Sequence, residues 1–203
     1  IPIPGYGMDK ITHANAFGGP ALVIQAVKEY SGLPIHHYIE MNLEGFVEIV
    51  DTVGGVQVTL DQPIDDQAGD VGHGLSDVTQ IPAGTQVLNA EQALTFVRSR
   101  HYPDGDFTRI RNQQKFLVAF AKQTLKSENI GRLPSITEAV ADNIDTDMTI
   151  PRMLRLATSF KDIRDSDIAG YTVPGTPAMI GGVSHVIPDG LAAHEIFAEF
   201  AAD

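Results

Sequence analysis

Hydrophobic residues recur along this chain with two spacings, one alternating and one helical. Val56, Val58 and Leu60 alternate with the polar residues Gln57 and Thr59, which predicts a half-buried strand. Further strands, rich in β-branched and aromatic residues, are expected at 35–41, 168–173 and 183–187. Helical spacing and capping residues predict helices at 22–30, 46–53, 91–97, 106–126, 133–143, 149–160 and 189–200.

The order of these elements indicates the fold class. Strands and helices interleave along the whole chain, which predicts an α/β or α+β fold, a three-layer α-β-α sandwich around a mixed central sheet. With 203 residues, of which 43% are hydrophobic, the chain can bury one sizeable core, so we expect a single domain over residues 1–203. Residues 61–80 show neither the alternating nor the helical spacing of hydrophobic residues, and we expect a solvated insertion there.

Composition excludes several classes of protein. The formal net charge of −12 argues against broad nucleic-acid binding, which requires many Lys and Arg residues to neutralise phosphates. The absence of cysteine excludes a disulfide framework and thiolate metal sites. No apolar run reaches the roughly 18 residues that a membrane-spanning helix needs. We therefore expect any membrane anchor to lie outside this sequence.

The positive charge is concentrated in one short segment. Four of the eight arginines, Arg98, Arg100, Arg109 and Arg111, lie within residues 98–114 of this acidic chain. Guanidinium groups form paired hydrogen bonds with phosphate oxygens, so the cluster indicates a site for an anion with several oxygens, such as a diphosphate. The same arginines are equally compatible with solvated side chains that pair with the protein's own carboxylates.

Helical spacing orients part of this cluster. If a helix begins near Asp106, then Asp106, Arg109 and Gln113 lie on one face of its first two turns, and Arg111 faces elsewhere. Free backbone N–H groups and the helix dipole also favour an anion there. Arg98 and Arg100 alternate at the end of the preceding segment and are expected to face the same cavity.

Ordered motifs point to a family. VRSR at 97–100 is followed by DFTRIRNQ at 106–113, which fits the pattern D-x-x-R-x-x-x-Q. Upstream, DKITHANAFGG occupies 9–19 and VGGV occupies 53–56, and residues 82–94 begin with PAG and end with LNAEQAL. Through these motifs the chain resembles the LytR-CpsA-Psr family of bacterial cell-wall glycopolymer ligases.

The resemblance implies a reaction. The family moves a glycopolymer such as teichoic acid, arabinogalactan or capsule from a polyprenyl-pyrophosphate carrier to a hydroxyl of peptidoglycan, with magnesium, on the extracytoplasmic face of the bacterial plasma membrane. A noncatalytic module that binds polyprenyl phosphates and a polyprenyl-pyrophosphate-glycan pyrophosphatase are the alternatives. The sequence contains no nucleophile elbow, C-x-x-C pair, Walker loop or Rossmann fingerprint.

Roles for individual residues follow from the resemblance. We expect Arg98, Arg100 and Arg109 to bind the diphosphate, with Gln113 as a hydrogen-bonding partner and Lys10 as a lesser contact. Three roles remain open for Asp106 as a catalytic residue: orienting an arginine, binding metal through water, or accepting the hydroxyl proton. The family's two metal-binding aspartates precede the Ile-Pro-Gly run that opens this sequence, so no metal ligand is assigned within it.

Overall fold

The structure, a computed structural model, describes residues 1–66, 76–100, 102–103, 106–124, 133–159 and 171–202. Contacts within the chain divide it into two compact units. The first unit combines residues 1–38 with residues 169–203, and the second comprises residues 39–168. The second unit is thus inserted between the two halves of the first. The expectation of one domain over the whole chain stays a prediction.

The first unit contains two hairpins and two helices. They are β1 (Pro2–Ile3), β2 (Gly7–Met8), α1 (Ile11–Ser31), β9 (Gly175–Ile180), β10 (Val183–Pro188) and α7 (Gly190–Ala202). The backbone of α1 is broken at Gly18 and Gly19, and Gly19 has a φ of 61°. Pro20 begins the second segment, which contains the helix predicted at 22–30. The segment before the break was not predicted, because its polar residues show no apolar period.

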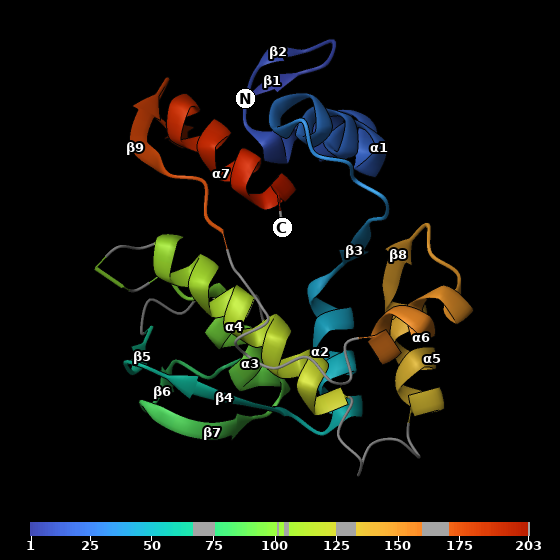
Figure 1. Cartoon of the computed structure of the whole chain (residues 1–203). Helices are drawn as coiled ribbons and strands as arrows, with labels where there is room; N and C mark the ends of the chain where they lie inside the picture. The colour runs from blue at the N-terminus through green and yellow to red at the C-terminus, as the bar shows by residue number, and fades with distance from the viewer. Residues whose placement is uncertain (67–75, 101, 104–105, 125–132, 160–170, 203) are drawn as a thin grey trace. The chain divides into compact units, whose positions relative to one another are not determined.

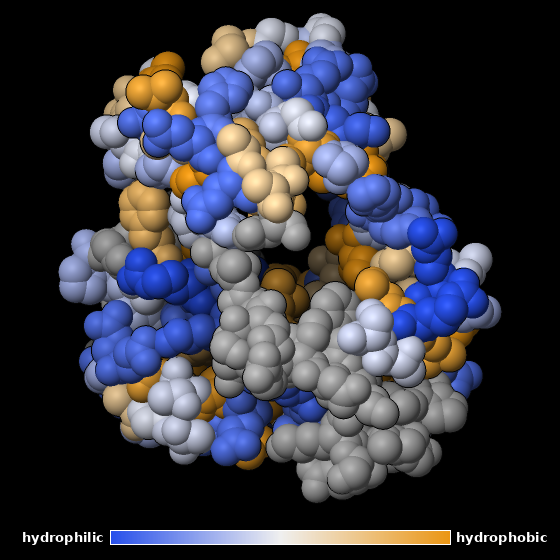
Figure 2. Space-filling view, in the orientation of Figure 1, coloured by the Kyte–Doolittle hydropathy of each residue, from blue (hydrophilic) through white to orange (hydrophobic). Residues whose placement is uncertain are grey.

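Aromatic contacts join the two helices of the first unit. Tyr30 on α1 and Phe197 on α7 meet edge to face, with ring centroids 5.6 Å apart. The last helix begins as predicted, because Asp189 Oδ1 accepts hydrogen bonds from the backbone N–H groups of Leu191 and Ala192. Figure 2 shows hydrophobic colours over the tip of the β9/β10 hairpin, where Met179 and other apolar residues are exposed.

One predicted strand of the first unit is wrong. Residues 171–173 are not in a strand, and residues 168–170 lie outside the described part of the chain. The strand begins instead at Gly175, because β9 and β10 pair from Gly175 opposite Pro188 to Ile180 opposite Val183. Gly181 and Gly182, with φ values of 59° and 79°, form the turn that fixes this register. The strand predicted at 183–187 is confirmed.

The second unit begins with β3 (Ile39–Met41) and α2 (Leu43–Val53) and contains the other elements. In order, these are β4 (Val56–Leu60), β5 (Ile64–Asp65), β6 (Gln80–Ile81), β7 (Gly84–Leu88), α3 (Ala90–Arg98), α4 (Asp106–Thr124), α5 (Leu133–Asn143), β8 (Ile144–Thr146) and α6 (Ile150–Ser159). The antiparallel pair of β4 and β7 packs with α3 and α4, and α2 packs with α3 and α5 (Figure 1).

The described residues of this unit form a hydrophobic core. It comprises Phe46, Val50, Val56, Val58, Leu60, Ile64, Ile81, Leu88, Ala90, Ala93, Leu94, Phe96 and Phe116. The buried positions of β4 alternate as predicted, and Phe46 of α2 contacts Phe116 of α4 with ring centroids 5.1 Å apart. The core thereby fixes α4, the helix that carries Arg109 and Gln113.

The α/β class is confirmed, and several details differ from the prediction. In the described residues the strands pair as five two-stranded antiparallel sheets, and a mixed central sheet is not among them. The strand predicted at 35–41 is limited to the three residues of β3 that find partners in β8. Residues 61–80 are not wholly solvated, because Ile64 is buried opposite Ile81 and Asp66 is buried beside them. Leu117 of α4 is 66% exposed, because α4 packs through Phe116.

None of the helices in the described part of the chain is long and apolar enough to span a membrane.

Candidate functional site

Helix α3 carries the first arginine of the cluster. A capping box fixes its start: Gln92 N donates to Asn89 Oδ1 at 2.9 Å, and Asn89 N donates to Gln92 Oε1 at 3.1 Å. The helix ends at Arg98, after which Ser99 adopts an extended conformation. Arg98 is half-buried, Ser99 is fully buried and Arg100 is exposed. That the two arginines face one cavity stays a prediction.

Two stripes of residues run along the first turns of α4. Thr108, Asn112 and Phe116 recur every four residues and are buried. Arg109 and Gln113 form the adjoining stripe, in which Arg109 is half-buried and Gln113 is exposed. A stripe displaced by one residue from a buried one lies at the edge of the packed face, where a ligand can reach it. The predicted helix, with Arg109 and Gln113 on one face, is confirmed.

A hydrogen bond joins the two helices at this edge. Gln113 Nε2 donates to the backbone oxygen of Val97 at 3.0 Å. Val97 directly precedes Arg98, and Arg109 lies one helical turn before Gln113. The bond therefore holds the turn that carries Arg109 against the end of α3 that carries Arg98. Gln113 has a positioning role within the protein, and its contact with a diphosphate stays a prediction.

A second hydrogen bond anchors the loop after Arg100. Asn112 Nδ2 donates to the Tyr102 hydroxyl at 2.9 Å, and Tyr102 N donates to the Arg100 backbone oxygen at 2.8 Å. Burial raises the pKa of the Tyr102 phenol, hydrogen bonds with Asn112 and Ser99 partly offset this rise, and the charge of Asp66 adds to it. The phenol is therefore neutral near pH 7 and acts as a structural hydrogen-bond partner.

Asn112 and Tyr102 were not among the residues singled out in the sequence. The available signal was the spacing of Thr108, Asn112 and Phe116, which places two polar residues on the buried face of α4. Polar residues on a buried face require partners, and one of them finds Tyr102. Arg111 faces elsewhere, as predicted: it is exposed, and its Nη2 donates to Thr108 Oγ1 within the helix.

The other two predicted site residues are Lys10 and Asp106. Lys10 belongs to the first unit and precedes α1, with its backbone N–H donating to Asp9 Oδ1 at 2.7 Å. Its contact with a diphosphate stays a prediction. Asp106 begins α4 as predicted, but its side chain lies outside the described part of the structure, as do residues 101, 104 and 105 of the loop before it. The three roles proposed for Asp106 therefore stay predictions.

The described residues contain no cluster of three metal-ligating side chains. No three His, Asp or Glu side chains in the described ranges lie close enough together to hold a metal ion. Magnesium in proteins is held by as few as one or two carboxylates together with water and substrate phosphates, so the expected use of magnesium stays a prediction. No catalytic step is assigned to the metal here.

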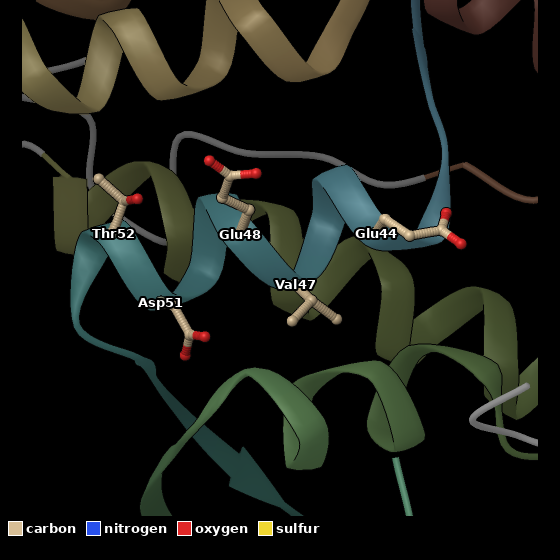
Figure 3. Close-up of a pocket in the computed structure, with 5 residues that line it drawn as sticks. All are labelled: Glu44, Val47, Glu48, Asp51 and Thr52. Carbon is tan, nitrogen blue, oxygen red and sulfur yellow. The ribbon is translucent and has the colours of Figure 1, made fainter. Parts of the chain in front are cut away.

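An acidic hollow on α2 is a poor place for a diphosphate. It has a volume of about 500 Å³ and is lined by Glu44, Val47, Glu48, Asp51 and Thr52. Figure 3 shows Glu48 and Thr52 pointing to one side of the helix and Val47 and Asp51 to the other. Three carboxylates would repel phosphate oxygens, and a diphosphate site at the arginine cluster stays a prediction.

Comparison with known proteins identifies relatives over nearly the whole chain. The LytR_cpsA_psr family model matches residues 1–202. The protein named polyisoprenyl-teichoic acid–peptidoglycan teichoic acid transferase TagU from Enterococcus faecalis is 31% identical over 187 residues, which are 91% of this chain and 58% of the relative. The protein of the same name from Oceanobacillus iheyensis is 33% identical over 194 residues, which are 92% of this chain and 57% of that relative. The chain thus spans little more than half the length of these relatives.

Solved structures share the fold. A protein from Enterococcus faecalis described as a transcriptional regulator has a TM-score of 0.79 and 26% identity, over 99% of this chain and 72% of its own. TagV from B. subtilis has a TM-score of 0.82 over 98% of this chain and 77% of its own. At 23% identity, this second likeness shows the fold alone.

Proposed function

Because the chain belongs to the LytR_cpsA_psr family, we propose that it is the catalytic part of a phosphotransferase that attaches a glycopolymer to peptidoglycan. The donor is a polyprenyl-pyrophosphate-linked glycan and the acceptor is a hydroxyl of peptidoglycan. Teichoic acid is the polymer that the names of two relatives indicate. The observation that carries the proposal is the hydrogen bond from Gln113 to Val97, which brings together the helix ends that bear Arg109 and Arg98.

Electrostatic stabilisation supplies the chemistry. The acceptor hydroxyl gives its proton to a base, for which Asp106 is one candidate, and its oxygen attacks the phosphorus that bears the glycan. The bond from this phosphorus to the bridging oxygen breaks, and polyprenyl phosphate leaves. Negative charge grows on the bridging and equatorial oxygens as the reaction proceeds. Arg98, Arg100 and Arg109 donate charge-assisted hydrogen bonds to these oxygens, and donors held in place before the reaction stabilise the transition state without reorganising.

The surrounding contacts support this role. Arg109 lies on the first turns of α4, where free backbone N–H groups and the helix dipole favour negative charge. Gln113 and Asn112 hold this helix start against the end of α3 and against the loop after Arg100. Phe116 anchors the same helix in the core. Arg98 and Arg109 are thus carried by helices, which favours a fixed geometry for binding a diphosphate.

Cofactor and location complete the proposal. Magnesium is the expected cofactor, with carboxylate ligands from outside the described residues. The expected location is the extracytoplasmic face of the bacterial plasma membrane, reached through an anchor outside this sequence. Lys10 is proposed as a lesser contact to the diphosphate, and Asp106 as a residue that orients an arginine, binds metal through water or accepts the hydroxyl proton.

Calorimetric titration with a short-chain polyprenyl pyrophosphate, with and without magnesium, tests the anion site. We expect binding that depends on the arginine cluster, and no binding would overturn the assignment. Transfer is tested by incubating a lipid-linked teichoic acid precursor with peptidoglycan and measuring covalent attachment. Release of polyprenyl phosphate with water as the acceptor would identify a pyrophosphatase, and binding without turnover would identify a binding module.

A further inference from the structure

An exposed aromatic stack lies where the β1/β2 hairpin meets α1 (Figure 1). The rings of Tyr6 and Phe17 are parallel to within 12°, with centroids 4.5 Å apart. Tyr6 is 55% exposed and Phe17 is 41% exposed. Large aromatic surfaces are normally withdrawn from water on folding, so a stacked pair left at the surface offers ring area to a ligand.

The local backbone holds the stack in place. Tyr6 N donates to the backbone oxygen of Ile3 at 2.9 Å, and Ile3 is buried. Phe17 is the last residue of the first segment of α1, directly before the break at Gly18 and Gly19. A ligand that binds here therefore does not have to order the loop that presents Tyr6.

A polar pair adjoins the stack. Asp9, His13 and Phe17 follow one another at intervals of four residues, and the His13 ring lies edge-on to Phe17, with centroids 6.0 Å apart. His13 Nδ1 lies 2.9 Å from Asp9 Oδ1. An ionised carboxylate can only accept, so Nδ1 carries the hydrogen, and Nε2 of the neutral ring is left as an acceptor. His13 is exposed, so this acceptor is available to a ligand hydroxyl.

We propose that Tyr6, His13 and Phe17 form a sugar-binding subsite, in which the aromatic stack covers the C–H face of a pyranose ring and His13 Nε2 accepts a hydrogen bond from one of its hydroxyls. Asp9 is the positioning residue that orients the imidazole. Sugars combine an apolar face with hydroxyls at the rim, and this arrangement matches rings beside a polar pair. A polyprenyl chain has no hydroxyl to satisfy the imidazole and would desolvate the Asp9 carboxylate without compensation.

The subsite rests on the proposed function, because a glycopolymer transferase handles two glycans, the donor polymer and the acceptor peptidoglycan. Either glycan supplies a pyranose ring with free hydroxyls. All of the residues of the subsite lie in the first unit, so its binding can be measured without the diphosphate and independently of the arginine cluster.

The test is an NMR titration of the full chain, observing the aromatic signals of Tyr6 and Phe17. The probes are a peptidoglycan disaccharide, a teichoic acid fragment and a short polyprenyl phosphate, each added separately. We expect one of the two saccharides to shift both signals in a saturable manner. The peptidoglycan probe would assign the subsite to the acceptor, and the teichoic acid probe would assign it to the donor. The proposal would be overturned if only polyprenyl phosphate shifted the two signals, or if none of the three probes shifted them.

Matched variants distinguish saccharide binding at the subsite from the effect of removing any exposed aromatic side chain. Phe17→Leu and His13→Ala are each expected to weaken the affinity for the saccharide by about 3- to 10-fold, through loss of one aromatic or one hydrogen-bonding contact. Phe200→Leu is the control, because Phe200 is a helical Phe of the same unit with 53% exposure. Equal weakening in the control would overturn the proposal. Arg98→Ala should leave saccharide binding unchanged while weakening diphosphate binding, so the two proposals can fail separately.

Discussion

Asn112 of α4 donates a hydrogen bond of 2.9 Å to the hydroxyl of Tyr102, a residue of the loop that separates the two pairs of arginines. Asn112 is buried and Tyr102 is half-buried, so this is an internal polar contact and not a surface one. It connects the buried face of the helix that carries Arg109 to the loop that follows Arg100. The conformation of the arginine cluster is thereby coupled to the packing of α4.

Asn112→Ala is expected to lower the free energy of unfolding by about 1–2 kcal/mol, because it leaves the half-buried Tyr102 hydroxyl without this donor. Urea denaturation of the variant and of the parent chain measures the difference. Combining it with Tyr102→Phe should cost less than the sum of the two single changes, because the partners share one bond. Strict additivity in this double-mutant cycle would show that the bond contributes nothing.

Arg98→Ala and Arg109→Ala are each expected to weaken binding of a polyprenyl pyrophosphate by about 10- to 150-fold, which corresponds to about 1.5–3 kcal/mol for one charge-assisted hydrogen-bonding partner. Arg109→Lys should recover only part of this loss, because an ammonium group lacks the paired donors of a guanidinium. Arg152→Ala is the control, because Arg152 is an exposed arginine of the same unit. Isothermal titration calorimetry gives the affinities, and a folded Arg98→Ala variant with unchanged affinity would refute the site.

Gln113→Ala removes the bond between α4 and the end of α3. We expect about 3- to 10-fold weaker binding of the diphosphate, with a loss of about 0.5–1 kcal/mol of stability, because Gln113 is exposed and orders the arginines more than it supports the core. Gln57→Ala, on the exposed face of β4, is a matched control. Calorimetry and thermal unfolding, performed on the same samples, separate the two effects. A loss of stability without a loss of affinity would assign Gln113 to folding alone.

Asn89→Ala removes the cap of α3 and should lower stability by about 1 kcal/mol, which shifts the Tm by about 2–4 °C in a chain of this size. Asn89→Ser should retain most of the stability, since serine also accepts a hydrogen bond at this position. The cap lies at the end of α3 remote from Arg98, so the affinity for diphosphate should stay within about twofold of the parent value. Scanning calorimetry and titration measure the two quantities.

The pairing of Asp9 with His13 predicts a pH dependence. The hydrogen bond from His13, followed by that from the Lys10 backbone, lowers the pKa of the Asp9 carboxyl below its ordinary value of 3.8. The ionised Asp9 carboxylate therefore stabilises the folded chain fully above about pH 4, and this stabilisation is lost as the pH falls through the lowered pKa. His13→Ala should return the pKa toward 3.8, whereas His185→Ala, which removes a weaker influence, should change it much less. NMR titration of the Asp9 side chain would decide this, and an unchanged pKa in His13→Ala would contradict it.

Local chemistry made part of this structure predictable. Helix α5 has the bounds expected from apolar spacing, Asp189 caps the helix that was predicted to begin there, and β4 alternates as its sequence does. These features depend on neighbouring residues along the chain. The placement of Arg109 and Gln113 on one face of α4 followed from the same helical period.

The remaining features depend on contacts between distant segments. The bounds of the strands that begin at Ile39 and Gly175 depend on the strands they pair with, so the local sequence pattern does not predict these bounds. The bond of Gln113 to Val97 requires α3 and α4 to pack at one angle, and the bond of Asn112 to Tyr102 depends on the loop between them. Sequence spacing therefore identified the candidate anion site but not the bonds that position it.

The insertion of one unit within the other sets the order in which the chain can fold. Residues 39–168 are continuous, so the arginine-bearing core can form as soon as this stretch has been synthesised. The first 38 residues must wait for residues 169–203, because Tyr30 packs against Phe197 of α7. Proteolytic loss of α7 would therefore first remove packing contacts from α1, at the opposite end of the sequence. The core between α2 and α4 would keep all of its own residues.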